Sequence, residues 1–361
     1  MKAALLPCLM FAAASACAAE PILGFNFPDW SRDGYASGTA QAQMRQLAAT
    51  GATWVALTPT LYVKDRGDSV VAATDKTPSD DALRAAIRAA RAQGLKVVLK
   101  PHVDVLKGGA RAWINPKDAK IWFASYRTYL LNYARIAREE NCSLFVVGTE
   151  LALLSAPNHW SAWRSLIKDV RAEYSGPLTY AANWHSAGLV GFWRELDFIG
   201  IDAYYPVAGG TNRTLLRVGW APISASLHAL AAANGRPILF TEFGLASQKG
   251  ANLRPWDYSN FGALDLDVQA AYVQTFLDQF STKSWVAGFL NWDWEQNPGG
   301  PQDKSMTLRG KPALGVFTGL FRSVRGALAC NEADFMPAQE AAAARARAVM
   351  AGSSFLLARG L

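Results

Sequence analysis

Short apolar runs alternate with helical patterns along nearly the whole chain, and this alternation constrains the fold more than any other feature. The runs are rich in β-branched and aromatic residues and predict strands over residues 22–27, 53–63, 96–105, 144–151, 178–184, 198–207, 237–247 and 286–295. Stretches of helical periodicity lie between most of them, at residues 39–50, 79–93, 119–140, 161–174, 223–233 and 266–281. Eight apolar strands that alternate with helices predict parallel βα units, and hence an α/β fold, a single-domain (β/α)8 TIM barrel.

Missing signatures exclude several other classes of protein. No Gly-rich phosphate fingerprint follows the first expected strand, so a nucleotide-binding fold is not indicated. The chain has 4 His residues and neither an H-E-x-x-H motif nor clustered Cys/His spacing, which argues against a catalytic metal. A G-x-S-x-G turn, which would indicate a Ser-His-Asp mechanism, is also missing. We therefore expect no cofactor.

The net charge of +7 limits the kinds of partner that the chain is expected to bind. Basic residues are scattered along expected helices, which is typical of a solvated face, so we expect no nucleic acid partner. An acidic polymer or an anionic envelope surface would suit this charge. No apolar run after the first 19 residues reaches the roughly 18 residues needed to span a bilayer, and we expect a monomer without a membrane span.

The first 19 residues have the features of a secretory signal peptide. Lys2 precedes an apolar stretch at residues 3–14, and Ala18 and Ala19 offer a cleavage site. A lipoprotein signal at Cys17 fits less well, because Leu is missing three residues before it. We expect a secreted or periplasmic protein with a barrel over residues 20–330 and a helical tail over residues 331–361 packed on the barrel.

Cleavage of this signal would leave two cysteines, Cys142 and Cys330. An exported protein meets an oxidising compartment, where the two could form a disulfide. The sequence does not show that the two sulfurs meet, so two separate thiols are an equal alternative.

Two glutamates each close an apolar run that predicts a buried strand. Residues 144–149 lead to Glu150, and residues 237–241 lead to Glu242. A buried strand can hold a carboxylate only at its end, where the barrel opens, and the carboxyl ends of all barrel strands form one face of the barrel. We therefore predict that both side chains face one cavity, where a pair of carboxylates can cleave a glycosidic bond. The alternative is that either glutamate forms a salt bridge at the end of its strand.

Aromatic and polar residues at the same strand ends predict a lining for carbohydrate. Flat rings pack on the apolar faces of pyranose units, and Trp292 is the expected platform beneath the reacting sugar. The residues predicted to bind substrate are His102, Asn183, Trp184, His185, Asp202, Tyr204, Tyr205 and Trp292. Further candidates for hydrogen bonds to hydroxyls are Asp104, Asn291, Asp293 and Glu295. Because alternate strand residues point away from the barrel interior, about half of the polar candidates are expected to be structural.

Four segments at these strand ends resemble glycoside hydrolase family 113 and its clan A relatives. In chain order they are residues 100–104 (KPHVD), 147–151 (VGTEL), 199–206 (IGIDAYYP) and 240–244 (FTEFG). The resemblance spans nearly all of residues 21–328. It implies a (β/α)8 barrel and retention of anomeric configuration, with Glu150 as acid/base and Glu242 as nucleophile. Because characterised members are endo-β-1,4-mannanases, β-mannan or manno-oligosaccharide is the implied substrate.

The chain departs from the wider clan immediately before the acid/base. Clan A enzymes commonly have Asn there, in contact with the sugar 2-hydroxyl, whereas this chain has Thr149. The Gly-Thr-Glu form fits family 113 but leaves open how the 2-hydroxyl is held. Either Tyr204 or Tyr205 resembles the tyrosine that often steadies the nucleophile from the sixth strand.

Three functions from different classes stay open. The first is a retaining endo-glycosidase on a β-mannan-like polymer. The second is a glycosidase on another envelope polysaccharide or exopolysaccharide, including an acidic one. The third is a carbohydrate-binding barrel without turnover, which the presence of both glutamates disfavours. Transglycosylation would use the same residues as hydrolysis and differs only in the second acceptor.

Overall fold

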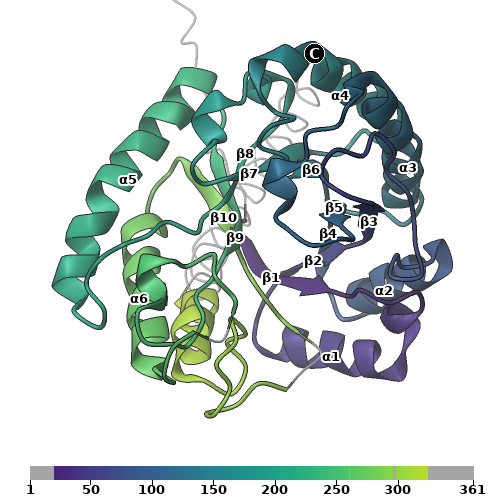
Figure 1. Ribbon diagram of the computed structural model, residues 1–361. Coiled ribbons are helices and arrows are strands. Elements are labelled where there is room, and N and C mark those ends of the chain that lie inside the picture. The colour runs from purple at the N-terminus through teal and green to yellow at the C-terminus, as the bar shows by residue number, and fades with distance from the viewer. Residues whose placement is uncertain (1–19, 260, 296–297, 324–361) are drawn as a thin grey trace, which may run out of the picture.

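Eight parallel strands close into a barrel in the order β1-β10-β9-β8-β7-β6-β4-β2 (Figure 1). The computed structural model describes residues 20–259, 261–295 and 298–323. The barrel strands are β1 (Ile22–Pro28), β2 (Trp54–Thr58), β4 (Lys96–Leu99), β6 (Leu144–Thr149), β7 (Leu178–Asn183), β8 (Ile199–Asp202), β9 (Ile238–Phe243) and β10 (Val286–Asn291). The predicted α/β class and (β/α)8 barrel are confirmed.

Helices surround the barrel on the outside, as Figure 1 shows. They are α1 (Gly38–Ala49), α2 (Asp80–Ala92), α3 (Ala119–Glu139), α4 (Trp160–Glu173), α5 (Arg213–Asn234) and α6 (Leu266–Phe280). Residues 312–323 are also helical. Several helices begin at a capping side chain: Ser37 accepts from the N–H of Ala40, and Asp118 accepts from those of Lys120 and Ile121.

Helix α5 is longer than the sequence predicted. The prediction began it at residue 223, but it begins at Arg213, where the side chain of Asn212 caps the first turn. Pro222 lies inside the helix. Proline lacks an N–H and normally ends or kinks a helix, so the sequence does not predict a helix that continues through this position.

The second and third expected strands are each divided in two. Strand β3 (Thr60–Val63) follows β2, and β5 (His102–Val105) follows β4; together they form a separate parallel pair. Prolines occupy both breaks, at Pro59 and Pro101, and proline cannot donate to a strand ladder. The pair therefore continues β2 and β4 beyond their carboxyl ends and lies over the barrel mouth.

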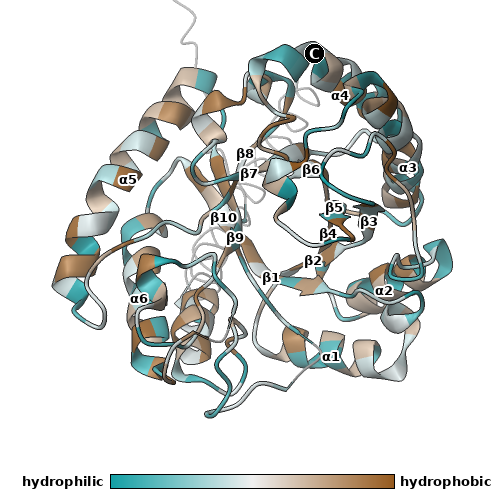
Figure 2. Ribbon diagram, in the orientation of Figure 1, coloured by the Kyte–Doolittle hydropathy of each residue, from teal (hydrophilic) through white to brown (hydrophobic). Residues whose placement is uncertain are grey.

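The core has two parts, because alternate strand residues point in opposite directions. Large side chains between strands and helices form the outer part. A smaller cluster fills the barrel interior and consists of Ile22, Trp54, Ala56, Val98, Leu144, Val146, Ala181, Leu239 and Leu290. Figure 2 shows the matching pattern, with hydrophobic residues along the barrel strands and mixed surfaces on the helices.

Three expectations fall on parts of the chain outside the described residues. These are the signal peptide over residues 1–19, the tail over residues 331–361 and Cys330, one of the two cysteines that could form a disulfide. Cys142 lies in the connection between α3 and β6, and burial raises the pKa of its thiol to about 12. Among the described residues, no helix is both long and apolar enough to cross a bilayer.

Candidate active site

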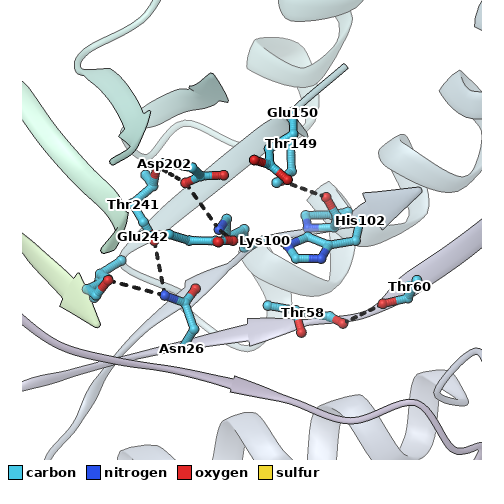
Figure 3. A network of polar contacts seen from close by, with 12 residues as sticks. Asn26, Thr58, Thr60, Lys100, His102, Thr149, Glu150, Asp202, Thr241 and Glu242 are labelled. Atoms are coloured by element: carbon cyan, nitrogen blue, oxygen red, sulfur yellow. Dashed lines mark hydrogen bonds and ion pairs between the residues drawn. The ribbon is translucent and has the colours of Figure 1, made fainter. Parts of the chain in front are cut away.

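Glu150 and Glu242 lie at the carboxyl ends of β6 and β9 and point toward one another across the barrel mouth (Figure 3). Glu242 is part of β9, whereas Glu150 directly follows β6 with a left-handed φ of 54°. Its N–H donates to the carbonyl of Ala181 at 2.7 Å. A non-glycine residue in this conformation is uncommon, and such residues cluster at functional sites.

Glu242 is almost completely buried, with an exposed fraction of 3%. The hydroxyl of Tyr204 donates to Oε2 at 2.6 Å, and the Lys100 ammonium contacts Oε1. Of the two candidate tyrosines, Tyr204 therefore contacts the glutamate. Tyr205 instead packs its ring against Trp184, with ring centroids 5.4 Å apart.

Lys100 is the charge partner of this buried carboxylate and was not among the predicted site residues. It is fully buried, and its Nζ also lies 3.5 Å from Oδ1 of Asp202. Oδ1 of Asp202 accepts from the Thr241 hydroxyl at 2.7 Å. Burial, together with the charge of Glu242, raises the pKa of Asp202 well above its ordinary value. Asp202 was predicted to bind substrate, but it contacts the groups that hold Glu242.

Glu150 has a different environment, because its side chain keeps an exposed fraction of 20%. Asn183, another predicted substrate-binding residue, donates from Nδ2 to Oε1 of Glu150 at 2.5 Å. A guanidinium nitrogen of Arg111 lies 3.9 Å from Oε2. Burial and the charge of Glu242 raise the pKa of Glu150 to about 7, while Arg111 and Lys100 oppose the shift. A carboxyl group with this pKa can carry a proton near neutral pH.

His102 lies between the glutamates and the aromatic lining. Its ring stacks on Trp292 with centroids 5.8 Å apart and an interplanar angle of 16°. Nδ1 of His102 lies 2.8 Å from Nη1 of Arg111, and Asp104 holds the same guanidinium at 2.8 and 2.9 Å. The sequence did not predict Arg111, which lies in a short 3-10 turn, Arg111–Trp113, without a periodic pattern.

A second aromatic group lies beside this centre. Trp184 stacks on Trp256, with ring centroids 5.8 Å apart, and packs edge-on against His185 at 5.3 Å. Trp184 and Tyr205 line a cavity of about 510 Å³ against α5. Neither glutamate is among the residues that line this cavity. Three predicted substrate-binding residues, Trp184, His185 and Tyr205, thus belong to one aromatic group.

The remaining candidates on and after β10 have other partners. Asn291 donates from its side chain to the carbonyl of Phe243 at 2.9 Å, which joins β10 to β9. Asp293 is buried, and burial with the charge of Glu295 raises its pKa well above the ordinary value. Glu295 is partly buried, and its pKa is also raised by burial. In the described part of the chain, no group of three or more His, Cys, Asp or Glu residues could hold a metal ion.

The fold and the site together define the class of the protein. A closed parallel barrel that carries two opposed glutamates and stacked aromatic rings at the carboxyl ends of its strands is typical of TIM-barrel glycoside hydrolases. The chain belongs to glycoside hydrolase family 113, whose family profile matches residues 24–308. The resemblance stated from the sequence motifs is therefore confirmed.

Solved structures agree with this membership. A family 113 β-1,4-mannanase is 30% identical with a TM-score of 0.78, and the match covers 84% of this chain and 99% of that chain. A family 113 β-mannanase from Alicyclobacillus acidocaldarius is 31% identical with a TM-score of 0.77, covering 84% of this chain and 98% of the other.

A more distant structure shares the fold alone. The β-glucuronidase of Ruminococcus gnavus is 14% identical with a TM-score of 0.60, and the match covers 83% of this chain and 50% of that one. A comparison with curated proteins gave no significant match.

Proposed function

We propose that the protein is an endo-β-1,4-mannanase that retains anomeric configuration by double displacement. The observation that carries this proposal is the contrast between two facing glutamates. Burial raises the pKa of Glu150 to about 7, whereas Glu242 is held by the Lys100 ammonium and the Tyr204 hydroxyl. Similarity to family 113 β-1,4-mannanases supports mannan as the substrate.

In the first step Glu242 attacks the anomeric carbon as a carboxylate. Lys100 and Tyr204 fix its orientation, so that one oxygen can face the substrate. The protonated Glu150 donates its proton to the departing glycosidic oxygen, and a glycosyl ester forms on Glu242.

In the second step the ester lacks the negative charge that Glu242 carried. Because this charge raises the pKa of Glu150, its loss lowers that pKa and favours the carboxylate. Glu150 then takes a proton from the incoming water, which cleaves the ester and returns the sugar with its original configuration. A sugar hydroxyl in place of water would give transglycosylation.

The substrate is tested by incubation of the purified protein with β-mannans, glucans, xylans and acidic exopolysaccharides. Chromatography of released oligosaccharides should detect products from β-mannan that disappear in a Glu242→Gln variant. Products from another polymer alone would contradict the mannanase assignment, and binding without any product would favour a carbohydrate-binding barrel.

The roles of Glu150 as acid and Glu242 as nucleophile are tested by comparing substrates with poor and good leaving groups. Glu150→Ala removes the acid, so we expect hydrolysis of β-mannan to fall by at least about a hundredfold. Aryl glycosides with good leaving groups need no proton and should keep their first step, whereas Glu242→Gln should abolish both reactions. An equal loss on both substrates in the Glu150→Ala variant contradicts the assignment.

We also propose that the protein is exported, because a polymer of this kind lies outside the cell and residues 1–19 resemble a signal peptide. N-terminal sequencing of protein recovered from the periplasm or the medium should give a start near Glu20. An intact Met1 in that fraction would contradict cleavage.

A further inference from the structure

We propose that Arg111 is a positioning residue that keeps the proton of His102 on Nε2, so that this N–H donates to the 2-hydroxyl of the sugar bound at Glu242. The inference rests on the glycosidase function proposed above. It assigns a role to a contact that the sequence motifs did not reveal, and it explains how the 2-hydroxyl is held although Asn is replaced by Thr149.

The tautomer of His102 follows from the chemistry of its partner. A guanidinium has five donors and no acceptor. Nδ1 of His102, 2.8 Å from Nη1 of Arg111, must therefore accept through its lone pair. Burial, and the nearby charges of Arg111 and Lys100, lower the pKa of His102 well below its ordinary value, so the ring is neutral. A neutral imidazole whose Nδ1 accepts carries its proton on Nε2.

The position and the plane of the ring are both fixed. Asp104 Oδ1 contacts Nε of Arg111 at 2.9 Å and Nη2 at 2.8 Å, which orients the guanidinium. Trp292 stacks on a face of the imidazole at an interplanar angle of 16°. The Nε2–H is thus aimed before substrate arrives, which avoids the cost of ordering it during binding.

Nε2 is a buried donor with no hydrogen-bond partner among the described residues. It lies 3.9 Å from Oε1 of Glu242, too far for a direct hydrogen bond but close to where the attacked carbon and its neighbours must lie. Of those neighbours, the ring oxygen gains positive charge in an oxocarbenium-like transition state and would be a poor acceptor. The hydroxyl on C2 is the acceptor that remains.

The residue before the acid/base does not offer a donor for this hydroxyl. The Thr149 hydroxyl donates to the carbonyl of Pro101 at 3.1 Å, so its proton is already used. The same segment, residues 100–102, supplies both Lys100 for Glu242 and His102 for the sugar. His102 therefore takes over the contact that an Asn supplies in other clan members.

The tautomer is tested first, without substrate. In ¹⁵N NMR spectra of the purified protein, with His102 assigned by comparison with His102→Gln, we expect a protonated Nε2 and an unprotonated Nδ1. Arg111→Lys keeps a partner that can only donate and should preserve this pattern, while Arg111→Met should lose it. Arg127→Met, which removes an exposed arginine paired with Asp169, is the control and should match wild type. A protonated Nδ1 in wild type overturns the proposal.

The contact to substrate is tested by comparing kcat/KM for an aryl β-mannobioside with its analogue that lacks the 2-hydroxyl on the reacting sugar. We expect a penalty of about tenfold to a hundredfold in wild type and in Arg127→Met, which shrinks toward unity in Arg111→Met and His102→Gln. Any general loss of activity cancels in this ratio. For an analogue that lacks the 3-hydroxyl, the ratio of kcat/KM values between parent substrate and analogue should be the same in wild type and in every variant.

The outcomes separate this inference from the proposed function. An active wild type with an equal 2-deoxy penalty in every variant overturns the role of His102 and leaves the mannanase function standing, as does a change confined to the 3-deoxy ratio. A wild type inactive on every β-mannoside overturns the proposed function and the substrate contact together, while the NMR result still decides the tautomer.

Discussion

At the scale of single residues, two glutamates in one barrel mouth are given different chemistry by their partners. Glu242 is buried, and its two oxygens contact the Lys100 ammonium and the Tyr204 hydroxyl. Burial and the charge of Glu242 raise the pKa of Glu150. Arg111 opposes this shift, but its nearest nitrogen lies 3.9 Å from the carboxyl group. The proposed division into nucleophile and acid thus rests on Lys100 and Tyr204 around Glu242, and on burial and the charge of Glu242 around Glu150.

The pH profile should report the pKa of Glu150. Because the acid must be protonated, kcat/KM should fall as pH rises through about 7. Lys100 lowers the pKa of Glu150, so Lys100→Met should move this limb to higher pH and lower kcat by about a hundredfold or more by removing the charge that holds Glu242. Lys120→Met, on an exposed position of α3, is the matched control. A limb that stays in place in Lys100→Met would show that the two groups are not coupled.

The sequence predicted the glutamates, because a carboxylate after an apolar run is conspicuous. Lys100, which directly follows residues 96–99, is an equally clear signal, because an ammonium at a buried strand end needs a charge partner. Asn183 and Asp202 were placed correctly at strand ends, but the structure shows them against Glu150 and Lys100. The sequence cannot separate a residue that touches substrate from one that holds its neighbour, because both need the same position.

At the scale of elements, the sequence did not predict that β3 and β5 form a separate two-stranded sheet after β2 and β4. Uninterrupted apolar patterns over residues 53–63 and 96–105 predicted single strands, while Pro59 and Pro101 divide them. The division places His102 and Asp104 in a strand above the barrel, where Arg111 reaches both. Arg111 was unpredictable because its reach depends on the loop after β5 and not on any periodic pattern.

The pairing of β1 with β2 in the barrel requires a close approach between the two strands at Gly24. A Cβ on Gly24 would lie 1.8 Å from the carbonyl oxygen of Trp54, an atom that cannot move without breaking the ladder. Gly24→Ala should lower the free energy of unfolding by at least ~3 kcal/mol or prevent folding, as measured by urea denaturation. Gly38→Ala, in the first turn of α1 with no atom within 4 Å, is the control and should stabilise by up to ~1 kcal/mol. Equal effects of the two changes would contradict this close contact.

At the scale of the whole molecule, the eightfold alternation of strand and helix was enough to predict the barrel, because few arrangements bury so many apolar strands. The fold then delivers both glutamates to one face whatever the details of the loops. The site carries a cost in stability, since it buries Lys100, Asp202 and Glu242 together. Stability and activity therefore compete at this face.

Thermal unfolding should reveal a cost in stability at Glu150 as well. The native pKa of Glu150, about 7, lies above its ordinary value of 4.5, so the native state binds more protons than the unfolded state between these values. Stability is therefore lost as pH rises through this window, by at most ~3 kcal/mol. Glu150→Gln removes the titration, so its melting temperature should exceed that of wild type at pH 8 and match it at pH 4.5. A difference that does not change with pH would contradict the raised pKa.

The most direct test of the double-displacement mechanism is to trap its covalent intermediate. The Glu150→Ala variant, mixed with a 2-deoxy-2-fluoro-β-mannosyl substrate that carries an activated leaving group, should accumulate a glycosyl ester, because the second step lacks its base. Mass spectrometry of the digested protein should place the added sugar on Glu242. Label on another residue, or release of the product with inverted configuration and no label, would contradict the assignment of Glu242 as the nucleophile.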